Sequence, residues 1–278
     1  MSRMLEETRP DGHGRARGLV SNRASGERLR ARTFAPRPDL RAVVDYYWST
    51  SWDLRGQAPH VAELLADPCV NVVLEEGRSR VVGVSTRIFR RELTGAGLIR
   101  SVKLRAGAAR ALLRHQTIAE LTDRMIPLET FFHDVRELEA AVLSPDQDQT
   151  AFARLEAWLE AHIHNDPDPR TTLAASIVER ITREPVLATS GQVAAAVGMS
   201  TRHLQRIFHD EVGASPKWVI RRVRLQEAAL RLERGELASL AALAAELGYS
   251  DHAHLTRDFT AATGRSPTTF MRTVWEKP

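Results

Sequence analysis

The chain of 278 residues carries a net charge of +4, and its 43% of hydrophobic residues can fill the cores of two domains. Its one cysteine excludes a disulfide framework within the chain, and the lack of any apolar run of about 18 residues argues against a membrane span. The N-terminus is polar and Arg-rich and has no hydrophobic signal core, so we expect a cytoplasmic protein with no membrane partner.

Positive charge is concentrated at the two ends of the sequence. Residues 1–32 have a net charge of +4, residues 33–169 a net charge of −4, and residues 170–278 a net charge of +4. A basic region attracts phosphate groups, so this distribution favours the C-terminal third as the part that meets nucleic acid. An excess of four charges is small, and it only corroborates that interpretation.

The first 32 residues are rich in Gly, Arg and Ser and show no hydrophobic periodicity, which predicts a disordered basic tail over residues 1–32. From about Thr33 to Leu104 apolar residues alternate with polar ones, as is typical of half-buried strands separated by Gly and Pro. The pattern predicts a small antiparallel sheet or partial barrel, with helices after Gly107. The alternating residues are Tyr46, Trp48, Trp52 and Leu54, then Val70, Val72 and Leu74, and finally Val102 and Leu104.

Two helical segments are predicted before an N-D-P-D-P linker at residues 165–169. They run from Asp134 to Leu143 and from Thr150 to His164, and they complete an N-terminal domain over residues 33–168. The apolar residues of the second segment form either a dimer seam or a face packed on their own domain, and the sequence leaves both open. These residues are Phe152, Leu155, Leu159 and Ile163.

The last third of the chain contains one pattern twice, 50 residues apart. One copy begins at Val193 and reads V-A-A-A-V-G-M-S-T-R-H-L-Q-R-I-F-H-D-E-V-G-A-S-P, and the other begins at Leu243 and reads L-A-A-E-L-G-Y-S-D-H-A-H-L-T-R-D-F-T-A-A-T-G-R-S-P. Two copies with the same turn glycines, caps and exit prolines rarely arise from packing needs alone, so the pattern predicts a duplicated helix-turn-helix. With one residue inserted in the second copy, Gly198, Ser200, Leu204, Arg206, Phe208, Gly213, Ser215 and Pro216 match Gly248, Ser250, Leu255, Arg257, Phe259, Gly264, Ser266 and Pro267.

Each unit has the residues that a helix-turn-helix needs. Gly198 follows a short apolar helix where a tight turn requires a positive φ, and Ser200 is a good N-cap for the next helix. That helix has an apolar stripe at spacings of three and four and a polar opposite face, the arrangement of a helix that lies in a major groove. Gly213 is expected to end it, and we expect the second copy to repeat each device.

A long helix is predicted between the two units, from Pro216 to Arg234, because this stretch has no interior Gly or Pro; Gly235 is expected to end it. Nineteen residues at ~1.5 Å each span about 28 Å. One turn of DNA is roughly 34 Å, so the strut would place the two second helices in successive major grooves on one face of the duplex. The resulting site need not be palindromic, since the two helices differ in sequence.

Residues from about Leu173 to Arg272 resemble the DNA-binding domain of the AraC/XylS family of transcription regulators. The resemblance lies in V-G-M-S-x-R-x-L-Q-R-x-F with G-x-S-P, then R-L-x-x-A, then L-G-Y-S-D-x-x-H-L-T-R-x-F with G-x-S-P. It implies an all-α domain over residues 169–278 with two helix-turn-helix units joined by one long helix, within an α+β protein. It further implies double-stranded DNA and RNA polymerase as partners, and no cofactor.

The resemblance assigns base reading to seven residues of the two second helices. Ala253 offers only a methyl contact, and His252 and His254 are weaker readers than long polar side chains, so we expect the first unit to carry more specificity. Simple solvent exposure is the alternative for the histidines, and ion pairs to Asp210 and Asp258 are the alternative for Arg206 and Arg257. The base-reading residues are Arg202, Gln205, Arg206, His252, Ala253, His254 and Arg257, and the expected backbone contacts are Ser200, Thr201, His209, Lys217, Ser250 and Thr256.

The N-terminal part resembles, more weakly, the effector or sensor domains attached to AraC-type readers. The resemblance is carried by W-S-T-S-W, D-P-C-V-N-V-V-L, V-V-G-V-S-T, V-K-L-R-A-G-A-A-R-A-L-L and L-T-D-R-M-I-P-L. It implies a small-molecule effector of unknown identity or a homodimer contact. By residue type alone the candidate pocket residues are Trp48, Trp52, His60 and Arg105, and the alternative for the tryptophans is a place in the core.

An enzymatic reading fits the sequence poorly. Pro68-Cys69 superficially resembles the site of cysteine-dependent alkyl acceptors, but Val70 stands where an activating histidine would follow. His162 and His164 face different ways on a helix, so we expect no metal site. The sequence therefore predicts a sequence-specific DNA-binding transcription regulator, an effector-gated activator, with a repressor or ligand-independent regulator as the alternative.

Overall fold

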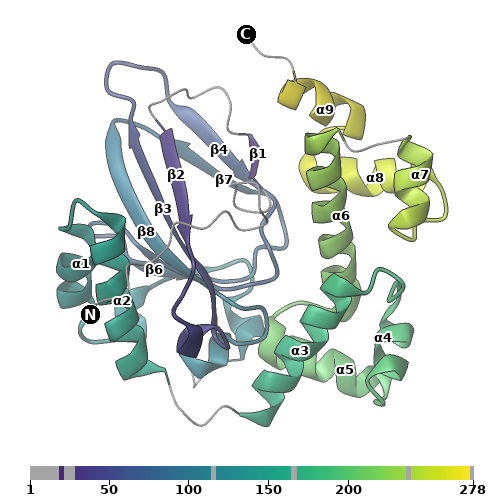
Figure 1. Ribbon diagram of the computed structural model, residues 1–278, viewed down its shortest axis with the longest axis horizontal. Helices are drawn as coiled ribbons and strands as arrows, with labels where there is room; N and C mark the ends of the chain where they lie inside the picture. The colour runs from purple at the N-terminus through teal and green to yellow at the C-terminus, as the bar shows by residue number, and fades with distance from the viewer. Residues whose placement is uncertain (1–18, 22–28, 114–116, 164–167, 236–238, 276–278) are drawn as a thin grey trace.

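The computed structural model describes residues 19–21, 29–113, 117–163, 168–235 and 239–275. Figure 1 shows two parts side by side, a β-sheet domain flanked by helices and a column of helices. This is the predicted α+β architecture, with an N-terminal sheet domain followed by an all-α domain.

The N-terminal domain contains two antiparallel sheets. A six-stranded sheet has the order β2-β3-β8-β5-β6-β9, and a three-stranded sheet has the order β1-β4-β7. The small antiparallel sheet predicted from the alternating residues is therefore confirmed. The strands are β1 (Leu19–Ser21), β2 (Leu29–Phe34), β3 (Val44–Asp53), β4 (His60–Leu64), β5 (Asn71–Leu74), β6 (Arg80–Val82), β7 (Phe89–Leu93), β8 (Ala96–Leu104) and β9 (Met125–Pro127).

Strands β1 and β2 begin within the segment for which a disordered tail was expected. That prediction is wrong for residues 19–21 and 29–32, while residues 1–18 and 22–28 lie outside the described residues. β2 pairs with β3 from Leu29 opposite Trp52 to Phe34 opposite Tyr47, but only its last two side chains are buried. The backbone ladder holds β2 in place without the side-chain alternation from which a strand is recognised.

Helices α1 (Val135–Leu143) and α2 (Asp148–His162) cover one face of the six-stranded sheet, within two residues of the predicted segments. Of the two alternatives for the apolar face of α2, packing on its own domain is the one observed, and a dimer seam through this face is excluded. The face is buried against its own sheet, with Phe152 stacked on Tyr47 at 5.2 Å between ring centroids. Phe152, Leu155 and Leu159 are fully buried and Ile163 packs at the edge of the same core. A homodimer through another surface stays a prediction.

The column of helices starts with α3 (Pro169–Arg183), and short 3-10 turns precede it at Pro38–Leu40, Ala109–Ala111, Ile118–Leu121 and Leu128–Thr130. In Figure 1, α6 stands upright between α3–α5 at its lower end and α7–α9 at its upper end. The remaining elements are α4 (Ser190–Ala196), α5 (Thr201–Ile207), the π turn η6 (Phe208–Val212), α6 (Pro216–Arg234), α7 (Leu240–Glu246), α8 (His252–Thr263) and α9 (Pro267–Trp275).

Helix α6 belongs to two hydrophobic cores. Its first half places Val219 and Ile220 in the main core, which the N-terminal domain, α3 and the first helix-turn-helix share. Its second half places Leu225 and Leu232 in a separate core with α7, α8 and α9, which also contains Leu65 of the N-terminal domain. The sheet domain therefore packs on both helix-turn-helix units.

Candidate nucleic-acid interface

The first helix-turn-helix unit is formed by α4 and α5, and its local devices are the predicted ones. Gly198 makes the turn at φ +66°, and Ser200 caps α5 by accepting a hydrogen bond from the backbone N–H of His203 at 3.2 Å. Gly213 ends the π turn at φ +80°, and Ser215 then caps α6.

Helix α5 turns its apolar stripe inward and its polar face to solvent. Leu204, Ile207 and Phe208 are fully buried in the main core. The exposed residues of α5 and η6 include all the predicted base-reading residues of this unit, as well as three of its expected backbone contacts. They are Ser200, Thr201, Arg202, His203, Gln205, Arg206 and His209.

Two arginines of the polar faces, Arg206 and Arg257, form no ion pair with the acids that were expected to bind them. Asp210 instead pairs with Arg170, with 2.6 Å between Nη2 and Oδ2, and Asp258 pairs with Arg221 at 2.9 Å. The ion pairs that were the alternative explanation for Arg206 and Arg257 are therefore absent, and neither side chain makes a hydrogen bond or ion pair with a described residue. Both remain available to base edges.

The second unit, α7 and α8, begins its second helix one residue later than expected. Asp251 is the N-cap, accepting from the backbone N–H of His254 at 2.7 Å, whereas the Ser250 hydroxyl hydrogen-bonds the Asp251 carboxylate. The hydrogen bond from the His254 N–H holds the pKa of Asp251 below its ordinary value. The prediction that Ser250 repeats the capping role of Ser200 is wrong, because the inserted residue moves the cap by one position.

Alignment of the two units on their caps changes which residues correspond. Each cap stands four residues before the buried leucine, so Arg202 corresponds to Ala253 and Gln205 to Thr256, which is half-buried. Arg206 corresponds to Arg257. At these three positions the second helix thus offers one long polar side chain where the first offers three.

The histidines of α8 are both exposed, as both base reading and the alternative explanation require, but they differ in their contacts. The ring of His254 lies edge-on to Tyr249, with 5.1 Å between centroids, and its Nε2 is 4.0 Å from Asp258. Lys217, an expected backbone contact, is exposed in the first turn of α6. Solvent exposure leaves His252 and Lys217 compatible with DNA contact and does not by itself assign it.

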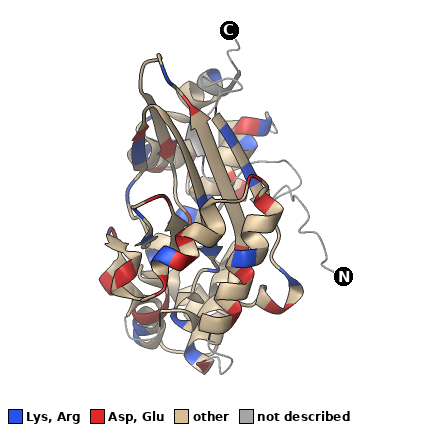
Figure 2. Ribbon diagram, turned by 90° about the vertical axis from the view of Figure 1, so that its left-hand side faces the viewer, with Lys and Arg blue, Asp and Glu red and all other residues tan. Residues whose placement is uncertain are grey.

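The N-terminal domain contacts the helical domain away from the polar faces of α5 and α8. Thr122 donates to the carbonyl of Gly213, and Arg265, after α8, pairs with Glu63 at 2.9 Å. The first contact lies just after η6, which follows α5, and the second lies just after the C-terminal end of α8. Figure 2, seen from the sheet side, shows basic and acidic residues interleaved over this domain, so charge of one sign does not gather there.

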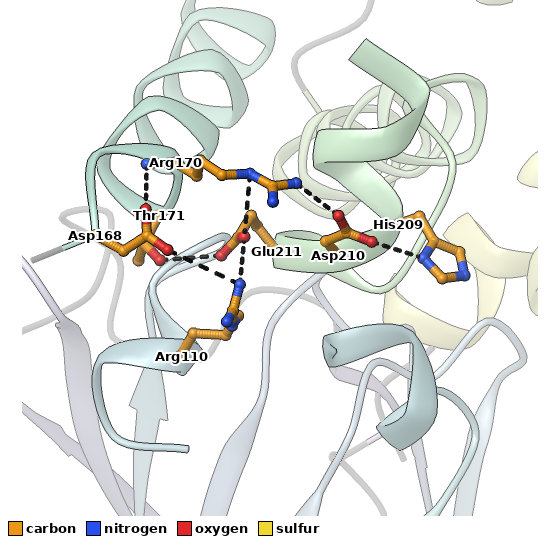
Figure 3. A network of polar contacts seen from close by, with 7 residues as sticks. All are labelled: Arg110, Asp168, Arg170, Thr171, His209, Asp210 and Glu211. Carbon is orange, nitrogen blue, oxygen red and sulfur yellow. Dashed lines mark hydrogen bonds and ion pairs between the residues drawn. The ribbon is translucent and has the colours of Figure 1, made fainter. Parts of the chain in front are cut away.

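A polar network joins the 3-10 turn at Ala109–Ala111, the start of α3 and the π turn η6, which directly follows α5 (Figure 3). The Glu211 carboxylate is fully buried in η6 and accepts from Arg110 of the N-terminal domain at 2.7 Å and from Thr171 of α3 at 2.9 Å. Arg170 reaches the neighbouring Asp210. Sequence reasoning missed this network, since Arg110 and Glu211 are 101 residues apart.

The four candidate pocket residues do not share one site. Trp48 and Trp52 pack among apolar residues between the two sheets, and their indole N–H groups donate to Asn71 Oδ1 and to the carbonyl of Thr94. His60 lies on β4 opposite Leu93. Arg105 instead lines a cavity of about 650 Å³ between the N-terminal domain, α3 and α6. Trp52 is thus buried in this apolar cluster, and Trp48 is half-buried against it.

Cys69 is unsuited to a nucleophilic role. Its side chain is buried, and burial raises the pKa of the thiol well above its ordinary value. Within the described ranges, no three His, Cys, Asp or Glu side chains are grouped as a metal site. The helices of the described part of the chain are all too short or too polar to cross a bilayer.

Two parts of the chain match known families. Residues 193–273 match the family described as a helix-turn-helix domain, and residues 32–127 match a domain of unknown function (DUF6597). HTH-type transcriptional regulator Rv1931c of Mycobacterium tuberculosis is 33% identical over 82 residues, which cover 30% of this chain and 31% of that protein. An uncharacterized HTH-type transcriptional regulator of Haemophilus influenzae is 35% identical over 83 residues, covering 30% of this chain and 28% of that protein. The chain thus spans less than a third of the length of the curated relatives it matches.

Solved structures give distant matches. The C-terminal domain of AraT, a response regulator from Geobacillus stearothermophilus, is 26% identical, covers 35% of this chain and 82% of that chain, and has a TM-score of 0.34. ToxT from Vibrio cholerae is 12% identical, covers 79% of this chain and 89% of that chain, and has a TM-score of 0.38. The family match over residues 193–273 coincides with the duplicated unit described above. The C-terminal part of this chain is therefore a helix-turn-helix domain of the AraC type.

Proposed function

We propose that the protein is a sequence-specific DNA-binding transcription regulator that reads two adjacent major grooves of one duplex. The observation that carries the proposal is the pair of exposed polar faces on α5 and α8, where neither Arg206 nor Arg257 makes a hydrogen bond or ion pair with any residue that the structure describes. Helix α6 holds these faces apart, and its 19 residues span about 28 Å at ~1.5 Å each. That length suits a separation of one DNA turn, roughly 34 Å.

We assign base reading chiefly to the first unit, where Arg202 and Arg206 suit guanine and Gln205 suits adenine. In the second unit Arg257 is the principal reader, with His252, Ala253 and His254 beside it. Backbone contacts are proposed for the residues at the helix starts and ends. They are Ser200, Thr201, His209, Lys217, Ser250 and Thr256.

The regulatory part of the proposal concerns the N-terminal domain. We propose that residues 33–168 form a sensor domain and residues 169–278 the reader, a division supported by the start of α3 at Pro169 after its Asp168 cap. An effector acting on this domain would gate an activator that works with RNA polymerase in the cytoplasm. Repression, ligand-independent regulation and a homodimer are the alternatives that a promoter assay and a measurement of mass in solution decide.

Arg206→Ala tests the reading assignment. A bidentate arginine–guanine pair contributes ~1 to 3 kcal/mol of discrimination, so the variant should lose preference at one position of a binding-site selection profile. Lys217→Ala is the control, because loss of a phosphate contact weakens binding about equally on all sequences. An unchanged profile for Arg206→Ala would refute the base-reading role, and failure of the wild-type protein to retain any specific genomic fragment would refute the function.

A further inference from the structure

A cavity of about 320 Å³ lies between the N-terminal domain, α6 and the end of α8. The loop before β7 forms one wall, with Thr86 and Ile88, and α6 forms another, with Trp218 and Leu225. A volume of this size is at the lower end of the range that small-molecule sites occupy. The cavity is separate from the polar faces of α5 and α8 and from the core between the two sheets.

The charged residues that line this cavity are all arginines. They are Arg87, Arg90, Arg221 and Arg222, and no Asp or Glu belongs to the lining. Four acids interact with them from outside the cavity lining. Glu63 accepts from the Nε of Arg90, Asp258 accepts from the Nε of Arg221, and Asp67 and Asp123 interact electrostatically with Arg222. Within the lining itself the charged groups are all positive, which favours an anion there.

Arg222 is the least exposed of these arginines, with only 4% of its surface accessible, whereas the other three are exposed. Its Nη2 donates to the carbonyl of Thr86 at 2.9 Å, and its guanidinium lies 4.6 Å from the centroid of the Trp218 ring. Its Nη1 is buried and has no hydrogen-bond partner among the described residues. Burial lowers the pKa of Arg222 to about 10, which still leaves the group charged at neutral pH.

A buried cation with an unpaired N–H is costly, and a carboxylate or phosphate oxygen is the partner that a guanidinium binds best. The cavity also has apolar walls, formed by Ile88, Leu225 and Ala262. We propose that this cavity binds a small organic oxyanion, with its phosphate or carboxylate group on Arg222 and its apolar part against Leu225 and Ala262. The ligand bridges the sensor-like domain, the strut and the end of α8.

Titration with sodium pyrophosphate at constant ionic strength and without DNA tests the site, using calorimetry and thermal unfolding. Wild-type protein should bind the probe saturably. Arg222→Met, which keeps an unbranched side chain of similar length, should bind it about tenfold or more weakly, because one charge-assisted hydrogen bond is lost. Arg136→Met removes an exposed arginine of α1, outside the cavity, and should bind like the wild type.

Equal affinity in Arg222→Met, or a thermal shift no larger than chloride gives, would overturn the assignment. Arg87→Gln covers the case in which Arg222→Met does not fold, since Arg87 is exposed at the rim and its loss should weaken binding severalfold. Competition between pyrophosphate and an unrelated DNA duplex, together with weaker duplex binding by Arg222→Met, would assign the cavity to a DNA phosphate and overturn the small-molecule proposal.

Any effect of the ligand on α8 as a DNA-reading helix rests on the proposed function, whereas anion binding is measured without DNA. The proposed anion site and the proposed function can therefore fail separately.

Discussion

Replacing Gly213 by alanine should weaken the protein where the N-terminal domain meets the first recognition helix. Gly213 has φ +80°, and a Cβ there would lie 2.8 Å from the carbonyl oxygen of Ile118 and 2.9 Å from Thr122 Oγ1. A left-handed conformation costs an L-residue about 1 to 2 kcal/mol, and overpacking adds about 1 to 3 kcal/mol. The expected loss in the free energy of unfolding is therefore about 2 to 5 kcal/mol.

Gly198→Ala is the matched control for this experiment. Gly198 also has a left-handed backbone, at φ +66°, but no atom lies within 4 Å of the position its Cβ would take. Its expected loss is the conformational term alone, about 1 to 2 kcal/mol. Urea unfolding followed by tryptophan fluorescence measures both variants. Equal losses in the free energy of unfolding would refute the reasoning, because they would show that the close approach to Ile118 and Thr122 adds no overpacking cost.

Three further predictions concern the cap, the thiol and the buried network. Asp251→Ala should lower the Tm more than Ser250→Ala; the difference should be full well above pH 3.8 and fade as the pH falls below it, because the folded pKa of Asp251 is depressed. Cys69 should react with a thiol reagent at pH 8 only in denaturant, and rapid reaction of the native protein would contradict its burial. Glu211→Gln should destabilise by about 3 kcal/mol in urea unfolding, the lower end for a broken buried pair since Arg110 is 25% exposed, and an unchanged midpoint would show that the network adds no stability.

The local devices of the helical domain could be predicted because each depends on residues only a few positions apart. Gly198, Ser200, Gly213 and Ser215 act on backbone groups of their own turn, so their roles follow from residue type and spacing. The shifted cap at Asp251 belongs to the same class. The inserted residue in the second copy contained that information, since a cap stands at a fixed distance before the buried leucine.

Features that join distant segments could not be predicted in this way. The contact between Arg110 and Glu211 depends on how the sheet domain docks on η6, which no periodicity records. Strand β2 was missed because backbone pairing holds it, without alternating buried side chains. For Trp48 and Trp52 the sequence left a pocket and the core both open, because residue type does not distinguish a cavity from a core. The cavity around Arg222 likewise requires a loop and two helices from different parts of the chain.

The length of α6 determines the relative rotation of the two helix-turn-helix units as well as the distance between them. One residue added to or deleted from its middle would turn everything after it by about 100° and shift it by ~1.5 Å. Because Val219 and Leu232 are anchored in different cores, neither half of α6 can absorb that rotation without leaving its own packing. The number of residues in α6 therefore fixes the relative orientation of the two units.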